Sequence, residues 1–236
     1  PEYVEEYTRD VSLEALAWKY MILFYHSVDE VVVPSRFIAQ LLHKRGLRNR
    51  KLLVLDRWVD LERFDPRHRT PGFWSRFGLA DEDASVKFIY VGRLGAEKNL
   101  DVLAEAFRAL HADHPDAHLL IVGDGPYRER LAALLEGLPV TFTGYLTGGD
   151  LSRALASADA KLFPSTTDTW GNAPLEAQAS GVPVVVSDRG GPQELMEHGV
   201  TGFRVTGGDP KALLAAMRQL MDRRVRTRMG HAARGF

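Results

Sequence analysis

The sequence predicts a doubly wound α/β fold, in which a parallel sheet carries helices on both faces. Short apolar segments recur from residue 86 onward, and each is apolar at consecutive positions, as expected of strands buried on both faces. Amphipathic helical segments alternate with them, which favours parallel strands joined by right-handed crossovers. We expect the strands at residues 86–91, 117–122, 139–143, 160–163, 183–187 and 202–205.

Two of the expected helices have distinct apolar faces. The first spans residues 99–113, and Asn99 can cap it. The second opens at Asp209-Pro210, where proline suits the first helical turn. Their inward-facing residues are Leu100, Leu103, Ala104, Phe107 and Leu110 in the first helix, and Leu213, Leu214, Met217 and Met221 in the second.

The amino-terminal part of the chain has a different organisation. Its periodicity predicts a helix at residues 13–24, a strand at 31–33, a helix at 35–44 and a strand at 51–55. Pro66 and Pro71 then lie among charged residues without periodicity, which indicates a linker. We therefore divide the chain into residues 1–60, a linker at 61–84 and an α/β domain at 85–236.

The composition excludes several classes of protein. The chain has 236 residues with 45% hydrophobic and 26% charged residues and a net charge of −1, so disordered and polycationic proteins are excluded and we expect no nucleic-acid partner. It has no cysteine, which excludes disulfides, thiolate nucleophiles and zinc–thiolate sites and suits a cytoplasmic location.

The longest apolar stretch, residues 15–25, contains Lys19 and is shorter than a membrane span. Because the chain starts at Pro1 and stops just after a helical pattern, we interpret it as a fragment.

Ligands of doubly wound sheets bind at the carboxyl ends of the strands, so the residues that follow the strands are the candidates. After strand 86–91, Arg93 and Lys98 flank one loop that starts at Gly92 and leads into a helix. A guanidinium and an ammonium group there suit two adjacent phosphates. A surface loop with two solvated cations is the alternative interpretation.

The turn after strand 117–122 contains two glycines, Gly123 and Gly125, followed by Pro126. Glycines in this arrangement permit positive φ angles and a close approach of the backbone to a ligand. The segment lacks the third glycine of a dinucleotide-binding fingerprint. An ordinary tight turn is therefore the other interpretation.

The most informative segment follows strand 160–163 and opens a helix. It carries two carboxylates, Asp168 and Glu176. With Pro174 at the first helical position, Glu176 falls near the third, where its side chain can reach the mouth of a cleft. The amides of Gly171, Asn172 and Ala173 suit an anion or a sugar hydroxyl. Helix capping by Glu176 and a loop position for Asp168 form the alternative.

Together these motifs resemble retaining glycosyltransferases of the GT-B fold, in the large family four, over about residues 25–235. The resemblance implies that residues 85–236 form a Rossmann-like donor domain and residues 1–60 the remnant of an amino-terminal acceptor domain. The segments that carry it are Gly92-Arg93-Leu94, Lys98-Asn99, the turn at 122–126, Phe142-Thr143-Gly144-Tyr145, the block from Asp168 to Glu176, and the run at 179–185.

The resemblance also implies roles for individual residues. Arg93 and Lys98 would hold the donor diphosphate, Glu176 the ribose hydroxyls and Asp168 the hydroxyls of the donor sugar. Family members usually have glutamate where this chain has Asp168, whose side chain is one methylene shorter. The backbone groups implied in donor binding belong to Gly171, Asn172, Ala173, Pro174 and Leu175 for the sugar and phosphate, Tyr145 and Leu146 for the base, and the glycines Gly92, Gly123 and Gly125.

The implied activity is transfer of a hexosyl group, with retained anomeric configuration and no metal ion, from a UDP-sugar or GDP-sugar to a glycan or lipid acceptor. GDP-mannose is one such donor, and we expect a monomer. A nucleotide-binding or scaffolding module without catalysis is the alternative. A nicotinamide oxidoreductase is disfavoured, because the first strand–helix turn lacks the three-glycine pattern.

Other patterns are interpreted as structural. Asp81-Glu82-Asp83 has the spacing of a metal-binding motif but precedes the first strand of the domain. His111, His114 and His118 cannot share a helical face because Pro115 interrupts the helix. The basic clusters at residues 44–51 and 223–228 are typical of solvated helix faces. Peripheral contact of residues 44–51 with an anionic membrane at its inner face is the second interpretation.

Overall fold

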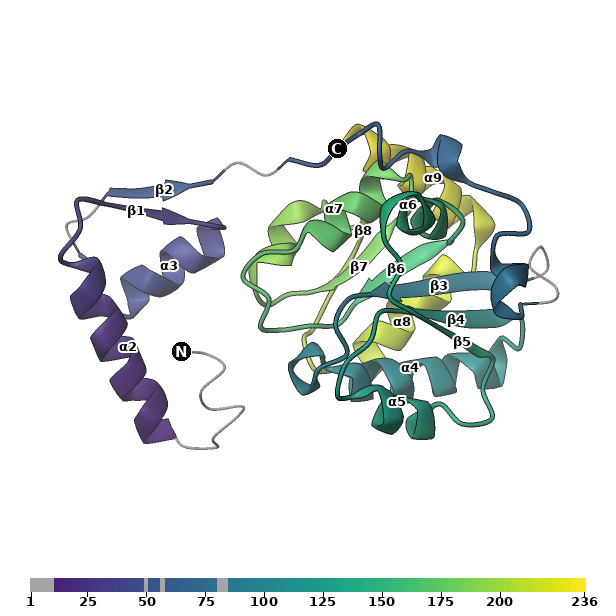
Figure 1. Ribbon diagram of the computed structural model, residues 1–236, viewed down its shortest axis with the longest axis horizontal. Coiled ribbons are helices and arrows are strands. Elements are labelled where there is room, and N and C mark those ends of the chain that lie inside the picture. Colours follow the sequence, from purple (N-terminus) through teal and green to yellow (C-terminus); the bar gives the residue numbers. More distant parts are fainter. Residues whose placement is uncertain (1–10, 49–50, 56–57, 80–84) are drawn as a thin grey trace.

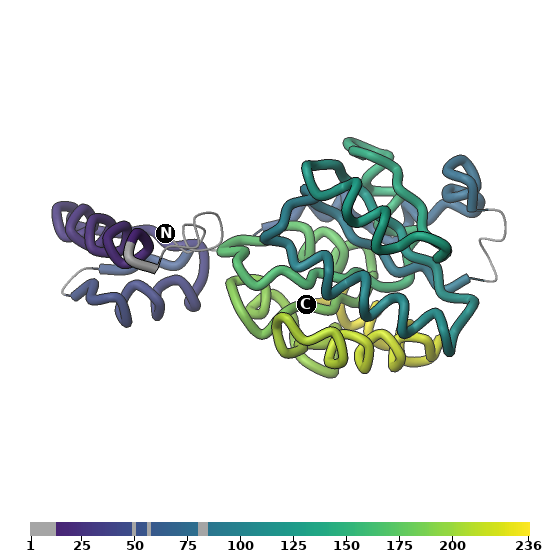
Figure 2. Tube along the Cα trace, turned by 90° about the horizontal axis from the view of Figure 1, so that it is seen from below, coloured from purple at the N-terminus to yellow at the C-terminus, as the bar shows by residue number. Residues whose placement is uncertain are grey.

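A computed structural model of the chain describes residues 11–48, 51–55, 58–79 and 85–236. The segment Asp81-Glu82-Asp83 and Arg50 of the first basic cluster lie outside the described residues. Figure 1 shows a sheet domain and, to its left, a smaller unit built from the amino-terminal elements. Figure 2 shows the same two parts side by side from another direction.

The structure confirms the doubly wound α/β fold (Figure 1). Within the described residues, the sheet has six parallel strands in the order β5-β4-β3-β6-β7-β8. Most strand bounds agree with the prediction, and β5 and β7 each begin one residue later. The strands are β3 (Val86–Val91), β4 (Ala117–Val122), β5 (Val140–Gly144), β6 (Ala160–Phe163), β7 (Val184–Ser187) and β8 (Gly202–Val205).

Two buried clusters cover the opposite faces of the sheet. Successive strand residues point to opposite faces, so Phe88 packs in one cluster with α4, α5 and α8, whereas Ile89 packs in the other with α6 and α7. The second cluster also contains Trp74 from the segment that precedes the sheet. The helices are α4 (Leu100–Asp113), α5 (Arg128–Leu134), α6 (Gly148–Ala156), α7 (Asn172–Ala179), α8 (Pro210–Leu220) and α9 (Arg223–Gly235).

The start of α4 differs from the prediction. Asn99 precedes the helix with a left-handed backbone (φ 53°), and its side chain makes no capping hydrogen bond. Instead, its Nδ2 donates to Thr166 Oγ1 over 2.9 Å and to the carbonyl oxygen of Pro164 over 3.3 Å. The expected capping role was therefore wrong, because the side chain of Asn99 joins the loop after β3 to the loop after β6.

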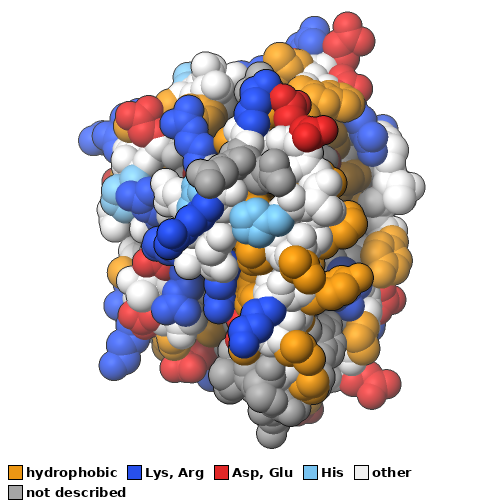
Figure 3. All heavy atoms as spheres, turned by 90° about the vertical axis from the view of Figure 1, so that its left-hand side faces the viewer, with side chains coloured by type: hydrophobic (Ala, Val, Ile, Leu, Met, Phe, Trp, Pro, Cys, Tyr) orange, Lys and Arg blue, Asp and Glu red, His pale blue; other side chains and the backbone are white. Residues whose placement is uncertain are grey.

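The smaller unit contains α2 (Val11–Tyr25), β1 (Glu30–Val33), α3 (Arg36–Lys44) and β2 (Lys51–Val54), and β1 and β2 pair in parallel. Its buried core consists of Trp18, Val31, Val33, Leu42 and Leu47. Glu194 of the sheet domain accepts hydrogen bonds from the first two amides of α3, which joins the two parts. In Figure 3, which faces this unit, hydrophobic side chains gather next to Lys and Arg side chains. Exposed apolar residues of α2 are Leu13, Leu16, Tyr20, Leu23 and Phe24.

The segment before the sheet packs against it although it lacks periodicity. It contains two short 3-10 helices, Pro66–His68 and Trp74–Phe77. Trp74 is fully buried, and its indole donates to the carbonyl oxygen of Ser157 over 3.1 Å. The segment is therefore fixed to the end of α6.

We predict that Gly123→Ala destabilises the fold more than Gly137→Ala does. Both glycines have positive φ angles (135° and 77°), but a Cβ on Gly123 would overlap the carbonyl oxygen of Gly92, whereas a Cβ on Gly137 would meet no atom within 4 Å. Gly137→Ala, the control, should lower the free energy of unfolding by about 1 kcal/mol, from backbone strain alone. Gly123→Ala should cost at least about 2 kcal/mol more, because two turns must move apart. Urea unfolding measures both values, and equal losses would contradict this packing.

Candidate functional site

The site is defined by the order of the strands. From β3 the chain continues outward through β4 and β5, and then returns to the other side of β3 to form β6, β7 and β8. The neighbouring strands β3 and β6 are therefore the point where the winding direction reverses. In doubly wound sheets a crevice opens at the carboxyl ends of such a strand pair, where the flanking loops turn to opposite faces. The loops at residues 92–99 and 164–171 start at the carboxyl ends of β3 and β6.

Side-chain contacts join these two loops. The Nζ atom of Lys98 lies 2.7 Å from Oδ1 of Asp168, and both side chains are only 16% exposed. Thr167 Oγ1 donates to the carbonyl oxygen of Glu97 over 3.3 Å. The two residues that the sequence analysis assigned to the diphosphate and to the donor sugar thus contact each other directly.

Asp168 retains an unused acceptor. Its second oxygen, Oδ2, is buried and has no hydrogen-bond partner among the described residues. A buried carboxylate oxygen without a donor is costly, so an arrangement of this kind is typical of a place where a ligand supplies the donor. The backbone oxygen of Asp168 accepts from the amide of Gly191 over 2.9 Å, which holds the residue in place.

Arg93 has a partner that the sequence analysis did not identify. Its guanidinium donates to Glu97, whose side chain is 1% exposed, whereas the side chain of Arg93 is about half exposed. Gly95 leaves the space that the Glu97 carboxylate occupies. Arg93 therefore lies at the surface of the loop, oriented by a buried carboxylate. Because Arg93 lies in the loop after β3 and Glu97 in a short 3-10 turn (Ala96–Lys98), no helical spacing indicated this pair.

The turn after β4, which contains Gly123 and Gly125, supports the loop that follows β3. The amide of Gly92 donates to the carbonyl oxygen of Val122 over 3.0 Å, and the amide of Leu94 donates to that of Asp124 over 2.9 Å. Gly125 permits a similarly close approach to Leu94. In this structure the close approach that Gly123 and Gly125 permit is to the backbone of the loop after β3.

Tyr145 and Leu146 follow β5 at the same edge. Tyr145 is 67% exposed, and its hydroxyl donates to the carbonyl oxygen of Asp124 over 3.0 Å. Leu146 packs against the core cluster on the α6 and α7 face. These two residues therefore lie beside the glycine turns, at one end of the crevice.

Helix α7 begins earlier than predicted. Gly171 precedes it in an extended conformation, and Asn172 and Ala173 are already helical. Pro174 is therefore the third helical residue and Glu176 the fifth, so the predicted positions were wrong by two residues. Leu175 is half-buried beside them.

Glu176 faces a cavity of about 370 Å³ between α7 and the segment before the sheet. Burial raises the pKa of its carboxyl group, and the positive charges of Lys161 and Arg63 oppose this rise. The residues that line the cavity are Trp58, Val59, Asp60, Arg63, Phe64, Trp170, Asn172 and Glu176.

Lys161 is a buried lysine that the sequence analysis missed. It lies in β6 with 0% of its surface exposed, and burial lowers its pKa to about 7, against the opposing charge of Glu176. Its Nζ lies 3.4 Å from the carbonyl oxygen of Val91, at the end of β3. Lys161 thus connects Glu176 electrostatically with the β3 edge, where Lys98 and Asp168 lie. A charged residue inside an apolar strand was the available signal.

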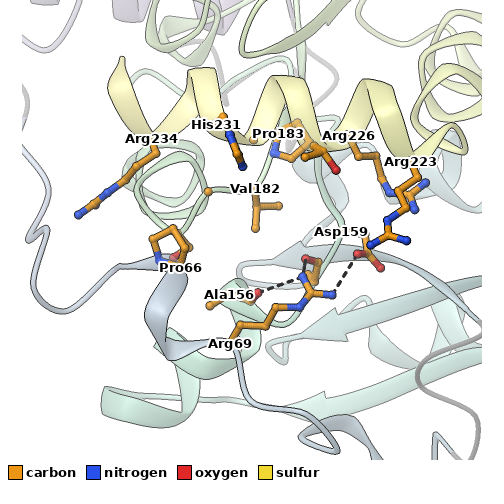
Figure 4. A pocket seen from close by; sticks show the side chains of 15 residues that line it. Pro66, Arg69, Ala156, Asp159, Val182, Pro183, Arg223, Arg226, His231 and Arg234 are labelled. Carbon is orange, nitrogen blue, oxygen red and sulfur yellow. Dashed lines mark hydrogen bonds and ion pairs between the residues drawn. The ribbon is translucent and has the colours of Figure 1, made fainter.

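A larger cavity, of about 590 Å³, lies beside α9 at the other end of the strands, next to the residues that precede β6 and β7 (Figure 4). Several arginines line it, and their guanidiniums donate to carbonyl oxygens: Arg69 to Ala158, Arg226 to Leu220 and Arg234 to Ala179. The second basic cluster contributes Arg223 and Arg226 to this cavity. Because these hydrogen bonds join α9 and the preceding segment to the sheet domain, we interpret the arginines as structural.

The other residues that the sequence analysis singled out are described in part, since Asp81-Glu82-Asp83 lies outside the described residues. In the described part of the chain, no three His, Cys, Asp or Glu residues group closely enough to hold a metal ion. The Nε2 atom of His118 forms a hydrogen bond of 2.9 Å with Thr141 Oγ1, and burial lowers the pKa of His118 to about 4.

Arg45 of the first basic cluster pairs with Glu14 over 3.0 Å. Among the described residues, no helix has the length and hydrophobicity needed to cross a membrane.

Known proteins are similar to this chain in sequence and in fold. The chain is 35% identical to the sulfoquinovosyl transferase SQD2 of Arabidopsis thaliana over 239 residues, which cover 99% of this chain and 46% of that protein. It is 32% identical, over 87% of this chain and 52% of the relative, to a GDP-mannose-dependent α-(1-6)-phosphatidylinositol dimannoside mannosyltransferase of Mycobacterium tuberculosis. The chain thus spans about half the length of these relatives.

Solved structures of GT-B glycosyltransferases have the same fold. Anabaena Alr3699/HepE, in complex with UDP and glucose, superposes with a TM-score of 0.80 at 22% identity, over 94% of this chain and 61% of that one. Sucrose-phosphate synthase of Thermosynechococcus elongatus gives 0.77 at 24% identity, over 92% and 56%. The family model for glycosyl transferases group 1 matches residues 85–223, which are more than half of the chain. The chain therefore belongs to the glycosyl transferases group 1 family.

Proposed function

We propose that this chain carries the donor-binding half of a retaining glycosyltransferase of family four, which transfers a hexosyl group from a UDP-sugar or GDP-sugar. The observation that supports it most is the Lys98–Asp168 pair at the edge where β3 meets β6. It combines a cation for a phosphate with a buried carboxylate oxygen that has no donor among the described residues. A nucleotide-sugar presents both groups, since it joins a diphosphate to a sugar with free hydroxyls.

The proposed roles follow from the chemistry of each group. Negative charge accumulates on the diphosphate as the glycosidic bond breaks, and Arg93, Lys98 and the first amides of α7 stabilise it. Asp168 accepts a hydrogen bond from a hydroxyl of the donor sugar through Oδ2, while Lys98 holds its other oxygen. Glu176 accepts hydrogen bonds from the ribose, and the backbone of Tyr145 and Leu146 contacts the base.

The relatives support more than one donor. Their names include GDP-mannose-dependent mannosyltransferases and a sulfoquinovosyl transferase, and HepE was solved with UDP and glucose. We therefore propose a UDP- or GDP-hexose donor, with GDP-mannose as one candidate, and a glycan or lipid acceptor. For the whole protein we propose a cytoplasmic monomer, with peripheral contact of residues 44–51 with the inner face of the membrane as the second interpretation of that basic cluster.

Calorimetric titration with UDP and with GDP tests donor binding. We expect at least one nucleotide to bind, and Lys98→Ala to weaken it by between about 10-fold and 100-fold, through loss of a charged hydrogen bond. Asp168→Asn should leave this affinity within a few-fold, because its proposed partner is the sugar. The exposed Lys211→Ala is the matched control. If both nucleotides fail to bind, or if Lys98→Ala and Lys211→Ala bind equally well, the proposed site is wrong.

Turnover in the complete enzyme tests the proposed source of charge stabilisation. Because Arg93 and Lys98 supply positive charge at the diphosphate, a chelator should change the initial rate by less than about twofold. Removing either cation should lower it by about 10²- to 10³-fold. Initial rates with EDTA, with added Mg²⁺ and for Arg93→Ala measure this. A rate that EDTA abolishes and Mg²⁺ restores would contradict the proposal, and binding without any turnover would favour a non-catalytic module.

A further inference from the structure

Glu194 supplies hydrogen-bond acceptors to a helix that lies far from it in the sequence. Its carboxylate accepts from the amide of Arg36, over 3.0 Å, and from the amide of Phe37, both at the start of α3. A carboxylate at this place complements the partial positive charge of a helix amino terminus. Arg36 and Glu194 are 158 positions apart, so the contact exists only because the smaller unit and the sheet domain meet here.

Helix α3 does not need Glu194 for its own cap. Ser35 precedes the helix with an extended backbone (φ −157°), and its Oγ accepts from the amide of Ile38 over 3.2 Å. This local cap is only 1% exposed and is therefore protected from solvent. The amides of Arg36 and Phe37 lie at the surface, where water can satisfy them. What Glu194 adds is a fixed position of one unit against the other.

The turn that carries Glu194 is attached to the loop of Asp168. The turn is a short 3-10 helix, Gly191–Leu195, and the amide of Gly191 donates to the backbone oxygen of Asp168 over 2.9 Å. Gly190 (φ 80°) makes this approach possible, because a Cβ on it would lie 2.5 Å from the same oxygen. Glu194 is thus held in a fixed relation to the loop that carries Asp168.

A second contact between the two units borders the same loop. Thr169, the residue after Asp168, lines an apolar cavity of about 290 Å³. The other residues that line this cavity belong to the smaller unit, among them Trp18 and Ile38. The smaller unit therefore lies directly beside the loop to which the donor sugar is assigned.

We propose that Glu194 is a positioning residue: its carboxylate, bound to the first amides of α3, holds the smaller unit in one position beside the loop of Asp168, and sugar transfer requires that position. This inference rests on the proposed function, which places the donor sugar at Asp168. A sugar held there reacts with an acceptor that comes from outside the sheet domain, and the smaller unit borders that approach. Because a displacement of about 1 Å can lower a rate by about 10²-fold, the relative position of the two units matters for turnover.

Two pairs of variants isolate the contact. Glu194→Ala removes both acceptor oxygens at an exposed position, and Glu197→Ala, at an exposed glutamate of the same segment, is its control. Arg36→Pro removes the amide hydrogen that Glu194 accepts, and proline is compatible with the first residue of a helix. Its control is Arg36→Ala, which loses the exposed side chain but keeps the amide.

Pulsed electron paramagnetic resonance measures whether the contact fixes the two units. The chain has no cysteine, so Lys44→Cys in α3 and Lys211→Cys in α8, both at exposed positions, carry the only spin labels. The distance between the labels should have one narrow distribution in the labelled parent, in Glu197→Ala and in Arg36→Ala. It should broaden in Glu194→Ala and in Arg36→Pro. The double variant should be no broader than either single variant, because both changes remove the same contact.

Turnover and nucleotide binding separate positioning from a role in the donor site. In the complete enzyme, Glu194→Ala and Arg36→Pro should lower kcat by about 10²-fold, whereas Glu197→Ala and Arg36→Ala should keep the wild-type value. The KM for the donor and the affinity for UDP or GDP should not change, since the proposed donor contacts belong to the sheet domain. The melting temperature should also stay the same, because Ser35 still caps α3.

The outcomes distinguish the inference from the function on which it rests. A wild type that binds no nucleotide defeats the proposed function and the inference with it. The inference alone is overturned if Glu194→Ala keeps the wild-type kcat, or if its label distances match those of the labelled parent. A loss of nucleotide affinity or of thermal stability in Glu194→Ala also overturns it, since Glu194 would then serve the donor site or the fold. Equal losses of kcat in Arg36→Ala and Arg36→Pro would assign the effect to the arginine side chain and contradict the inference.

Discussion

The constraint on which the rest of this structure depends is the reversal of strand order at β3 and β6. Because β4 and β5 lie on one side of β3 and β6, β7 and β8 on the other, two loops leave the same edge toward opposite faces of the sheet. One loop supplies Lys98 and Arg93, and the other supplies Asp168. Charges that are 70 residues apart in the sequence thereby come within 2.7 Å of each other.

The electrostatic arrangement at this edge is balanced within the chain. Lys98 is compensated by Asp168 and Arg93 by Glu97, while Lys161 and Glu176 act on each other from β6 and α7. A bound diphosphate would add negative charge beside the first two pairs without requiring the cations to move far. Preorganised charges of this kind stabilise a developing charge without a large reorganisation cost.

The sheet was predictable from sequence because strands buried on both faces leave unbroken apolar runs, such as residues 86–91 and 117–122. The start of α7 was not, because Asn172 and Ala173 have no pattern that distinguishes a first helical turn from a loop. The side chain of Asn99 binds the neighbouring loop instead of its own helix, which depends on the order of strands and not on local sequence. The contact between Lys98 and Asp168 and the burial of Lys161 depend on strand order for the same reason.

We propose that the crevice at the carboxyl ends of β3 and β6 holds the diphosphate and the sugar of a nucleotide donor. A crystal structure of the chain with UDP-glucose or GDP-mannose tests it most directly. We expect a phosphate oxygen within hydrogen-bonding distance of Lys98 Nζ and a sugar hydroxyl on Asp168 Oδ2. A nucleotide bound instead in the arginine-lined cavity beside α9, with Lys98 and Asp168 still paired only to each other, would contradict it.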